Sequence, residues 1–179
     1  MSIPKKPEPV KLVASILSAE ERLFQSAIQE LSVAFGAVEF STEPQPFKYT
    51  RYYCEEMGND IQRGFIAFAT LVPRDRLAEI KIWTNGLEES YRIPGGGRRL
   101  NIDPGFLTLD NLILATGKNY AHRVYLSKGI FADLTLLYKK GSFHPLPWTY
   151  PDYAEEATIR MFNDIRRRYL EQLRAQVRV

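Results

Sequence analysis

The chain contains a single cysteine, Cys54. An intrachain disulfide is therefore excluded, and so is a zinc site built from several thiolates. Long apolar runs are absent as well: none reaches the roughly 18 residues that mark a membrane-spanning helix, and no segment has the pattern of a secretory signal peptide. We therefore expect a cytoplasmic protein without a membrane partner.

Histidine is almost as scarce, with two copies in 179 residues. The triplets His122-Arg123-Val124 and His144-Pro145-Leu146 both lack the hydroxyl that the His-x-Thr/Ser motifs of two-histidine phosphoesterases require, so that family is excluded. Two histidines with Asp103 or Asp133 would suffice for a facial metal triad. Nothing in their spacing demands one, so we predict no metal site and name no cofactor.

A complete Walker A motif is also missing. Before Gly117-Lys118, Leu112 stands where the first glycine of that motif belongs, and Asn119 replaces its Ser or Thr. What the sequence does contain is the run Gly95–Arg99, three glycines followed by two arginines. Consecutive glycine N–H groups can converge on an anion, and arginines can bind phosphate or carboxylate bidentately. The alternative is a flexible loop with solvated arginines.

Charge of one sign is not in large excess. The formal net charge is +3 and the pI is about 8.9, which is weak evidence for a nucleic-acid partner. The length and the 45 % hydrophobic content fit one globular domain. We expect a flexible lead over residues 1–10, which are rich in Pro and Lys, and a single α+β domain over residues 11–179.

The first half of the chain predicts the order βαββα, which matches the start of a ferredoxin-like βαββαβ unit. The compact apolar run Lys11–Leu17 is typical of a buried strand. Apolar residues then recur at helical spacing up to Phe35, and Gly36 suits the end of that helix. The remaining elements expected here are a strand at 37–41, a hairpin of 51–56 and 63–70, and a helix that begins at Pro73.

The second half predicts more strands and one helix. We expect a short strand at 99–102 that ends in a turn at Asp103-Pro104-Gly105, whereas 107–116 fits either a short helix or a buried strand. The meander that follows is expected at 121–126, 130–138 and 142–144. A three-residue turn at 127–129 then places Arg123 opposite Asp133. The closing helix is expected from Tyr153 to about Gln176, with Asp152 as its cap.

These elements together predict an α+β fold: a mostly antiparallel sheet with packed helices, a ferredoxin-like N-terminal part (βαββα) and a C-terminal helix. Polar side chains are concentrated between residues 81 and 133, and we predict that they converge on one pocket. Lys81, Asn85 and Glu88 share a face of the helix after Pro73 and border this pocket, unless that face is a solvated stripe.

The predicted pocket suits a small anionic or phosphorylated ligand. The predicted ligand-binding residues are Gly96, Arg98, Arg99, Asn101, Lys118 and Arg123. For any chemistry, His122 is the predicted general acid or base, and Asp103 and Glu88 are the carboxylates predicted either to orient it or to bind a metal. The alternative for His122 is a hydrogen-bonded core residue, and whether the protein is an enzyme stays open.

A second class of function stays open beside this one. The segment Trp148–Tyr153 is an aromatic turn that anchors the last helix or offers a ring platform, and that helix carries several arginines. Together they would suit a non-enzymatic module that binds RNA or protein. Acidic residues interleave with those arginines, however, and indicate a solvated face. A homodimer that buries the aromatic segment is a further alternative.

Five blocks carry a resemblance to a known family: Tyr52–Gly58, Lys81–Asn85, Asn101–Gly105, His122–Leu126 and Trp148–Tyr153. They resemble a bacterial family known as domain of unknown function 4416, and the similarity extends over nearly the whole chain. The last three blocks, NIDPG, HRVYL and WTYPDY, are the most specific. The resemblance implies a single-domain bacterial cytoplasmic protein, and it carries over neither a catalytic residue nor a reaction type.

Overall fold

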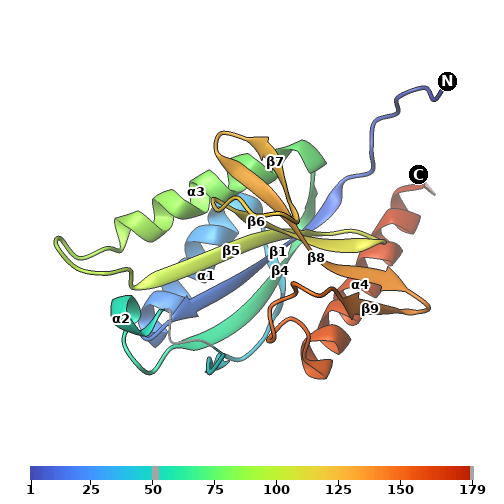
Figure 1. The fold of residues 1–179 in the computed structure, drawn as a ribbon. Coiled ribbons are helices and arrows are strands. Elements are labelled where there is room, and N and C mark those ends of the chain that lie inside the picture. Colours follow the sequence, from blue (N-terminus) through green and yellow to red (C-terminus); the bar gives the residue numbers. More distant parts are fainter. Residues whose placement is uncertain (50–52, 178–179) are drawn as a thin grey trace.

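A computed structural model describes residues 1–49 and 53–177 (Figure 1). Its strands form one sheet in the order β2-β4-β1-β5-β6-β8-β7, with β3 beside β4, β9 beside β8, and every pairing antiparallel. The strands are β1 (Val10–Ser18), β2 (Val38–Ser41), β3 (Gln45–Pro46), β4 (Gln62–Val72), β5 (Leu100–Leu107), β6 (Asn111–Thr116), β7 (Arg123–Ser127), β8 (Ile130–Lys139) and β9 (Ser142–Pro145).

Helices cover both faces of this sheet. One core contains Phe24 and Ile80, from α1 (Glu21–Phe35) and α3 (Leu77–Ser90). A second core contains Phe162 and Tyr169, from α4 (Glu156–Val177). Because both of its faces are covered, β1 is buried along its whole length, which explains its nearly continuous apolar sequence. The remaining helical elements of the described residues are α2 (Cys54–Met57) and the 3₁₀ turn Arg74–Arg76.

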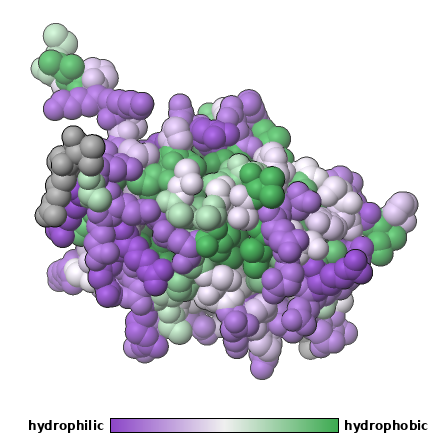
Figure 2. Space-filling model, turned by 180° about the vertical axis from the view of Figure 1, so that it is seen from behind, coloured by the Kyte–Doolittle hydropathy of each residue, from purple (hydrophilic) through white to green (hydrophobic). Residues whose placement is uncertain are grey.

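Apolar groups also remain at the surface of α1 and α3. The rings of Phe35 and Trp83 meet edge-on with centroids 4.9 Å apart, which ties the end of α1 to α3. Val33 and Ile82, on the same two helices, are exposed. Figure 2 shows apolar side chains gathered near the centre of the molecule as seen from behind.

The predicted α+β class, with its mostly antiparallel sheet and C-terminal helix, is confirmed. The strand order β2-β4-β1-β5, with α1 and α3 in one core, is compatible with the expected ferredoxin-like start. Within the described residues, no helix has the length and apolar character needed to cross a membrane.

The hairpin of β7 and β8 confirms one predicted contact and corrects another. Arg123 lies opposite Asp133, as expected. The turn, however, has two residues, because Ser127 already pairs with Ile130. Lys128 and Gly129 both have positive φ, 53° and 78°, as the tight turns that match the twist of a hairpin require.

The strand predicted at 51–56 is wrong for the part that the structure describes, and residues 50–52 lie outside the described residues. The carbonyl of Tyr53 accepts the N–H groups of Glu56 and Met57 at 3.2 and 2.8 Å, which makes this segment helical. Met57 is buried in a small apolar cluster, so packing outweighs the strand preference of the aromatic residues here. β4 pairs instead with β1, β2 and β3.

The turn predicted at Asp103-Pro104-Gly105 is also wrong, because β5 runs through these residues. Pro104 has no N–H to donate, but β6 pairs with β5 only from Gly105 onward, so one edge of β5 is open at the proline. Gly105 is required by the close approach of β6, because an added Cβ would lie 2.7 Å from the carbonyl oxygen of Ile113. The ambiguous segment 107–116 contains β6.

We expect Gly105→Val to lower the free energy of unfolding by about 1–3 kcal/mol, because the new side chain would overpack against a backbone oxygen that cannot rotate away. Gly86→Ala in α3 is the matched control. Among the described residues, nothing lies within 4 Å of its added Cβ. Alanine favours a helix over glycine by up to about 1 kcal/mol, so that variant should gain stability. Denaturant unfolding measures both, and a Gly105→Val variant as stable as wild type would contradict this packing.

Candidate functional site

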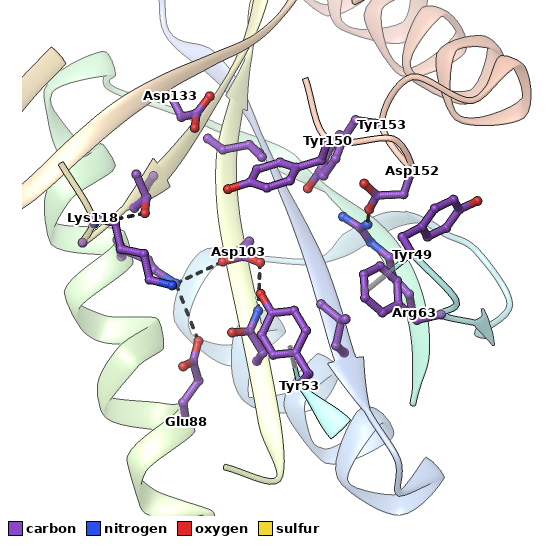
Figure 3. Close-up of a pocket in the computed structure, with 18 of the residues that line it drawn as sticks. Tyr49, Tyr53, Arg63, Glu88, Asp103, Lys118, Asp133, Tyr150, Asp152 and Tyr153 are labelled. Carbon is purple, nitrogen blue, oxygen red and sulfur yellow. Dashed lines mark hydrogen bonds and ion pairs between the residues drawn. The ribbon is translucent and has the colours of Figure 1, made fainter. Parts of the chain in front are cut away.

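A cavity of about 630 Å³ lies among α3, β5 and the loop that precedes α4 (Figure 3). Its basic lining residues are Arg63, Lys81, Arg98 and Lys118. Its acidic lining residues are Glu88, Asp103, Asp133 and Asp152. Because the two signs are balanced among these described residues, recognition in this cavity depends on the direction of individual groups more than on net charge.

Tyrosines form a second part of the wall. Tyr49, Tyr53, Tyr150 and Tyr153 all line the cavity, and Figure 3 shows Asp103 between Tyr53 and Tyr150. Burial, and then the charge of the nearby Asp103 carboxylate, raises the pKa of the Tyr53 phenol. Tyr53 therefore keeps its proton and can donate a hydrogen bond.

Lys81 ties α3 to β5. Its Nζ donates to the carbonyl of Ile102 at 2.6 Å and to Asp103 Oδ1 at 3.4 Å, and it lies 3.6 Å from Glu88 Oε1. An ammonium has three N–H donors, which equals the number of these oxygens. Lys81 and Glu88 are buried while Asn85 is exposed, so the solvated-stripe alternative is wrong for the first two.

Glu88 is the second buried member of this group. Its Oε1 accepts the N–H of Ile102 at 2.8 Å. Burial raises the pKa of Glu88, and this effect outweighs the opposing influence of Lys81 and of the Ile102 N–H. Glu88 therefore holds its proton to a higher pH than an exposed glutamate does.

Arg98, Asn101 and Asp103 form a continuous polar chain along the wall. Arg98 Nη1 donates to Asn101 Oδ1 at 3.0 Å, and Asn101 Nδ2 donates to Asp103 Oδ2 at 2.8 Å. Asn101 and Asp103 are two residues apart on β5, so their side chains share a face of the sheet. A guanidinium and a carboxylate are thus held at the two ends of one carboxamide.

Arg63, on β4, occupies another part of the wall. Its guanidinium pairs with Asp152, and its Nε donates to Ser15 Oγ at 2.9 Å. The guanidinium carbon lies 4.5 Å from the ring centroids of both Phe65 and Tyr153. Burial raises the pKa of Tyr153 to about 12, so this phenol stays neutral. The group is a buried ion pair enclosed by rings.

The predicted general acid or base, His122, lies beside the cavity and not among its described lining residues. Its ring stacks on Trp148 with centroids 4.8 Å apart, and its Nε2 lies 3.4 Å from Asp133 Oδ2. Arg123 donates to the same oxygen at 2.8 Å and to Tyr150 Oη at 2.9 Å. Asp133 and Tyr150 line the cavity, so His122 and Arg123 contact residues of its wall without being among its described lining residues themselves. The catalytic role of His122 stays a prediction.

Gly96 and Arg99 also lie outside the described lining residues of this cavity. Gly96 donates its N–H within its own tight turn at 2.8 Å, and Arg99 Nε binds Glu20 at 2.6 Å. The glycine run packs on α2, since an added Cβ at Gly97 would lie 2.5 Å from the carbonyl oxygen of Glu56. Of the predicted ligand-binding residues, those that line the cavity are Arg98, Asn101 and Lys118.

Sequence reasoning missed the part of the wall that lies outside residues 81–133. A local signal existed for Arg63, because an arginine at the start of the apolar run GFIAFATLV indicates a buried ion pair. No local signal marked its partner. The last helix begins at Glu156 and not at Tyr153, so the predicted role of Asp152 as its cap is wrong. Asp152 pairs with Arg63 instead.

The described residues contain no group of three or more His, Cys, Asp or Glu side chains arranged to hold a metal ion. Asp103 and Glu88 already have the Lys81 ammonium as a shared cation. His144 Nε2 lies 3.1 Å from the carbonyl of Lys139, a contact within the hairpin of β8 and β9. The facial-triad alternative therefore gains no support.

The fold and the site define an α+β domain with a polar, tyrosine-lined cavity beside its sheet. The chain belongs to the family described as Domain of unknown function (DUF4416), whose model matches residues 8–169. No curated protein matches the chain, and no solved structure matches it. The family is the one expected from the NIDPG, HRVYL and WTYPDY blocks.

We expect Asp152→Ala to lower the free energy of unfolding by about 3–5 kcal/mol, because it leaves the buried guanidinium of Arg63 without its counter-charge. The double variant Arg63→Met/Asp152→Leu removes both charges and should recover most of that loss. Denaturant unfolding compares the three proteins. If the double variant were less stable than Asp152→Ala, the pair would not be the buried ion pair described above.

The stability of the wild type should fall relative to that of Glu88→Gln as the pH rises. The raised pKa means that the folded protein binds this proton more tightly than the unfolded chain does. Its contribution is complete below the ordinary value of 4.5 and is lost as the pH rises through the folded-state pKa. Unfolding from about pH 4 to about pH 8 measures the difference, which should not stay constant.

Proposed function

We propose that the chain binds a small anionic ligand, such as a phosphate ester, in the cavity beside α3 and β5. The observation that carries this proposal is the guanidinium of Arg98 in the wall. A guanidinium has five N–H donors, and Arg98 directs Nε, Nη1 and Nη2 toward Glu56 and Asn101 with one donor each. Among the described residues the other two donors have no hydrogen-bond partner, and together with Lys118 in the same wall they suit the oxygens of an anion.

A ligand can replace Glu56 as the ion-pair partner of Arg98. The Glu56 side chain is 42 % exposed, and exposed ion pairs contribute only about 0–1 kcal/mol. A phosphate group offers several acceptor oxygens and a bidentate geometry, so it can compete with this carboxylate. The ion pair of Arg63 with Asp152 is buried and is not open to the same exchange.

The size and the walls of the cavity support a small-molecule ligand. Its volume of about 630 Å³ falls within the range of about 300–1,000 Å³ typical of such sites. Tyr53 and Tyr150 add ring surface together with hydroxyl groups. For a reaction at this site, the geometry supports Glu88 and Asp103 over His122, because only the first two are among the described lining residues.

The alternative of an RNA- or protein-binding module has less support. Arg160 and Arg167 of α4 pair with acidic residues of the same helix, as in a solvated face. Trp148 donates its Nε1 to the carbonyl of Leu134 at 2.8 Å and stacks on His122, which favours the anchoring role of the aromatic segment. A homodimer through this segment stays a prediction.

We expect inorganic phosphate, ribose 5-phosphate or AMP to raise the melting temperature of the wild type, because a ligand of the folded state stabilises it by mass action. Arg98→Ala should weaken the affinity for the stabilising compound about 10- to 100-fold, the usual effect of losing hydrogen bonds to a charged group. Titration calorimetry measures the affinities.

Arg99→Ala is the matched control, because Arg99 binds Glu20 outside the described cavity wall. This variant should keep the wild-type affinity. Equal weakening by both substitutions would indicate a general charge effect and would argue against a binding site at Arg98. No stabilisation by any phosphate compound would remove the proposal.

A further inference from the structure

The acidic side chains of the cavity wall differ in their partners within the protein and in their exposure to solvent. Asp152 is paired with Arg63, and Asp133 Oδ2 accepts from Arg123. Glu88 accepts the N–H of Ile102 and lies beside Lys81. The side-chain exposures of Asp133, Asp152 and Glu88 are 5, 8 and 9 %, whereas that of Asp103 is 31 %. Asp103 is therefore the described lining carboxylate that a ligand can best reach.

Asp103 has acceptor capacity beyond the contacts that it makes with the described residues. Its Oδ1 accepts from Lys81 at 3.4 Å, and its Oδ2 accepts from Asn101 at 2.8 Å. A carboxylate has about four acceptor sites and, when ionised, no donor. A ligand group that meets Asp103 must therefore donate hydrogen bonds. Two adjacent donors can bind the two oxygens together.

Asp103, which can accept hydrogen bonds from a ligand, lies close to Arg98, the residue proposed to bind the anion. Both contact the side chain of Asn101: Arg98 donates to Asn101 Oδ1, and Asn101 Nδ2 donates to Asp103. One small molecule can therefore touch both groups, with an anionic end at the guanidinium and its donors at the carboxylate. Tyr53 and Tyr150 lie on either side of Asp103 (Figure 3) and flank the donor end.

We propose that Asp103 selects ligands that carry a pair of adjacent hydroxyl groups in addition to a phosphate group, the chemistry shared by sugar phosphates and ribonucleotides. This inference rests on the proposed function, because it assigns the second half of the same site. Hydroxyl groups fit better than ammonium groups, since Lys81 already lies against Asp103 and a second cation there would be repelled.

The test compares matched ligands by titration calorimetry on the full chain. The probes are ribose 5-phosphate and 2-deoxyribose 5-phosphate, AMP and 2′-deoxy-AMP, and inorganic phosphate. The wild type should bind the dihydroxy member of at least one pair about tenfold or more tightly than its deoxy counterpart. The pair with the larger preference distinguishes a free sugar phosphate from a nucleotide.

Asp103→Ala should remove this preference, so that the variant binds the two members of each pair with equal affinity. The wild-type comparison needs no variant to fold: equal affinity for both members of each pair overturns the selection by Asp103. If phosphate compounds bind in an Arg98-dependent manner without that preference, the proposed function stands and this inference fails. If none of the probes binds, both fail.

Discussion

A buried ammonium must be surrounded by oxygen atoms, and this requirement at Lys81 organises the centre of the structure. Its three oxygen neighbours come from α3 itself, through Glu88, and from β5, through Ile102 and Asp103. Loss of that cation would leave Glu88 and Asp103 without the counter-charge that they share, and Glu88 is buried. The helix is therefore fixed on the strand at this point, and the wall of the cavity follows from that placement.

The parts of the fold that could be predicted are those whose signals are local. The apolar run Lys11–Leu17 identifies β1, and the helical spacing that ends at Gly36 identifies α1. The predicted pairing of Arg123 with Asp133 is correct although the turn is one residue shorter than expected, because the register shifts between Tyr125 and Ser127. Lys81 and Glu88 could be assigned to one face because helical spacing determines it.

The remaining parts depend on contacts that no local pattern encodes. Asp103-Pro104-Gly105 has the composition of a turn, yet it continues β5 because β1 pairs with it throughout. Arg98 lines the cavity and Arg99 is not among its described lining residues, yet both precede β5, so no strand periodicity in the sequence distinguishes the two arginines. Arg63 on β4 and Asp152 before α4 are brought together by the tertiary fold and not by a local pattern.

The cavity wall is completed by segments from distant parts of the sequence. The hydroxyl of Tyr49 donates to Glu155, 106 residues further along the chain. Contacts of such long range form slowly, because the entropy of closing a large loop must be overcome first. During synthesis from the N-terminus, the sheet strands through β6 are available well before Tyr150 and Tyr153 leave the ribosome. The wall of the cavity is therefore complete only after the segment that carries Tyr150 and Tyr153 has been synthesised and has packed against the sheet.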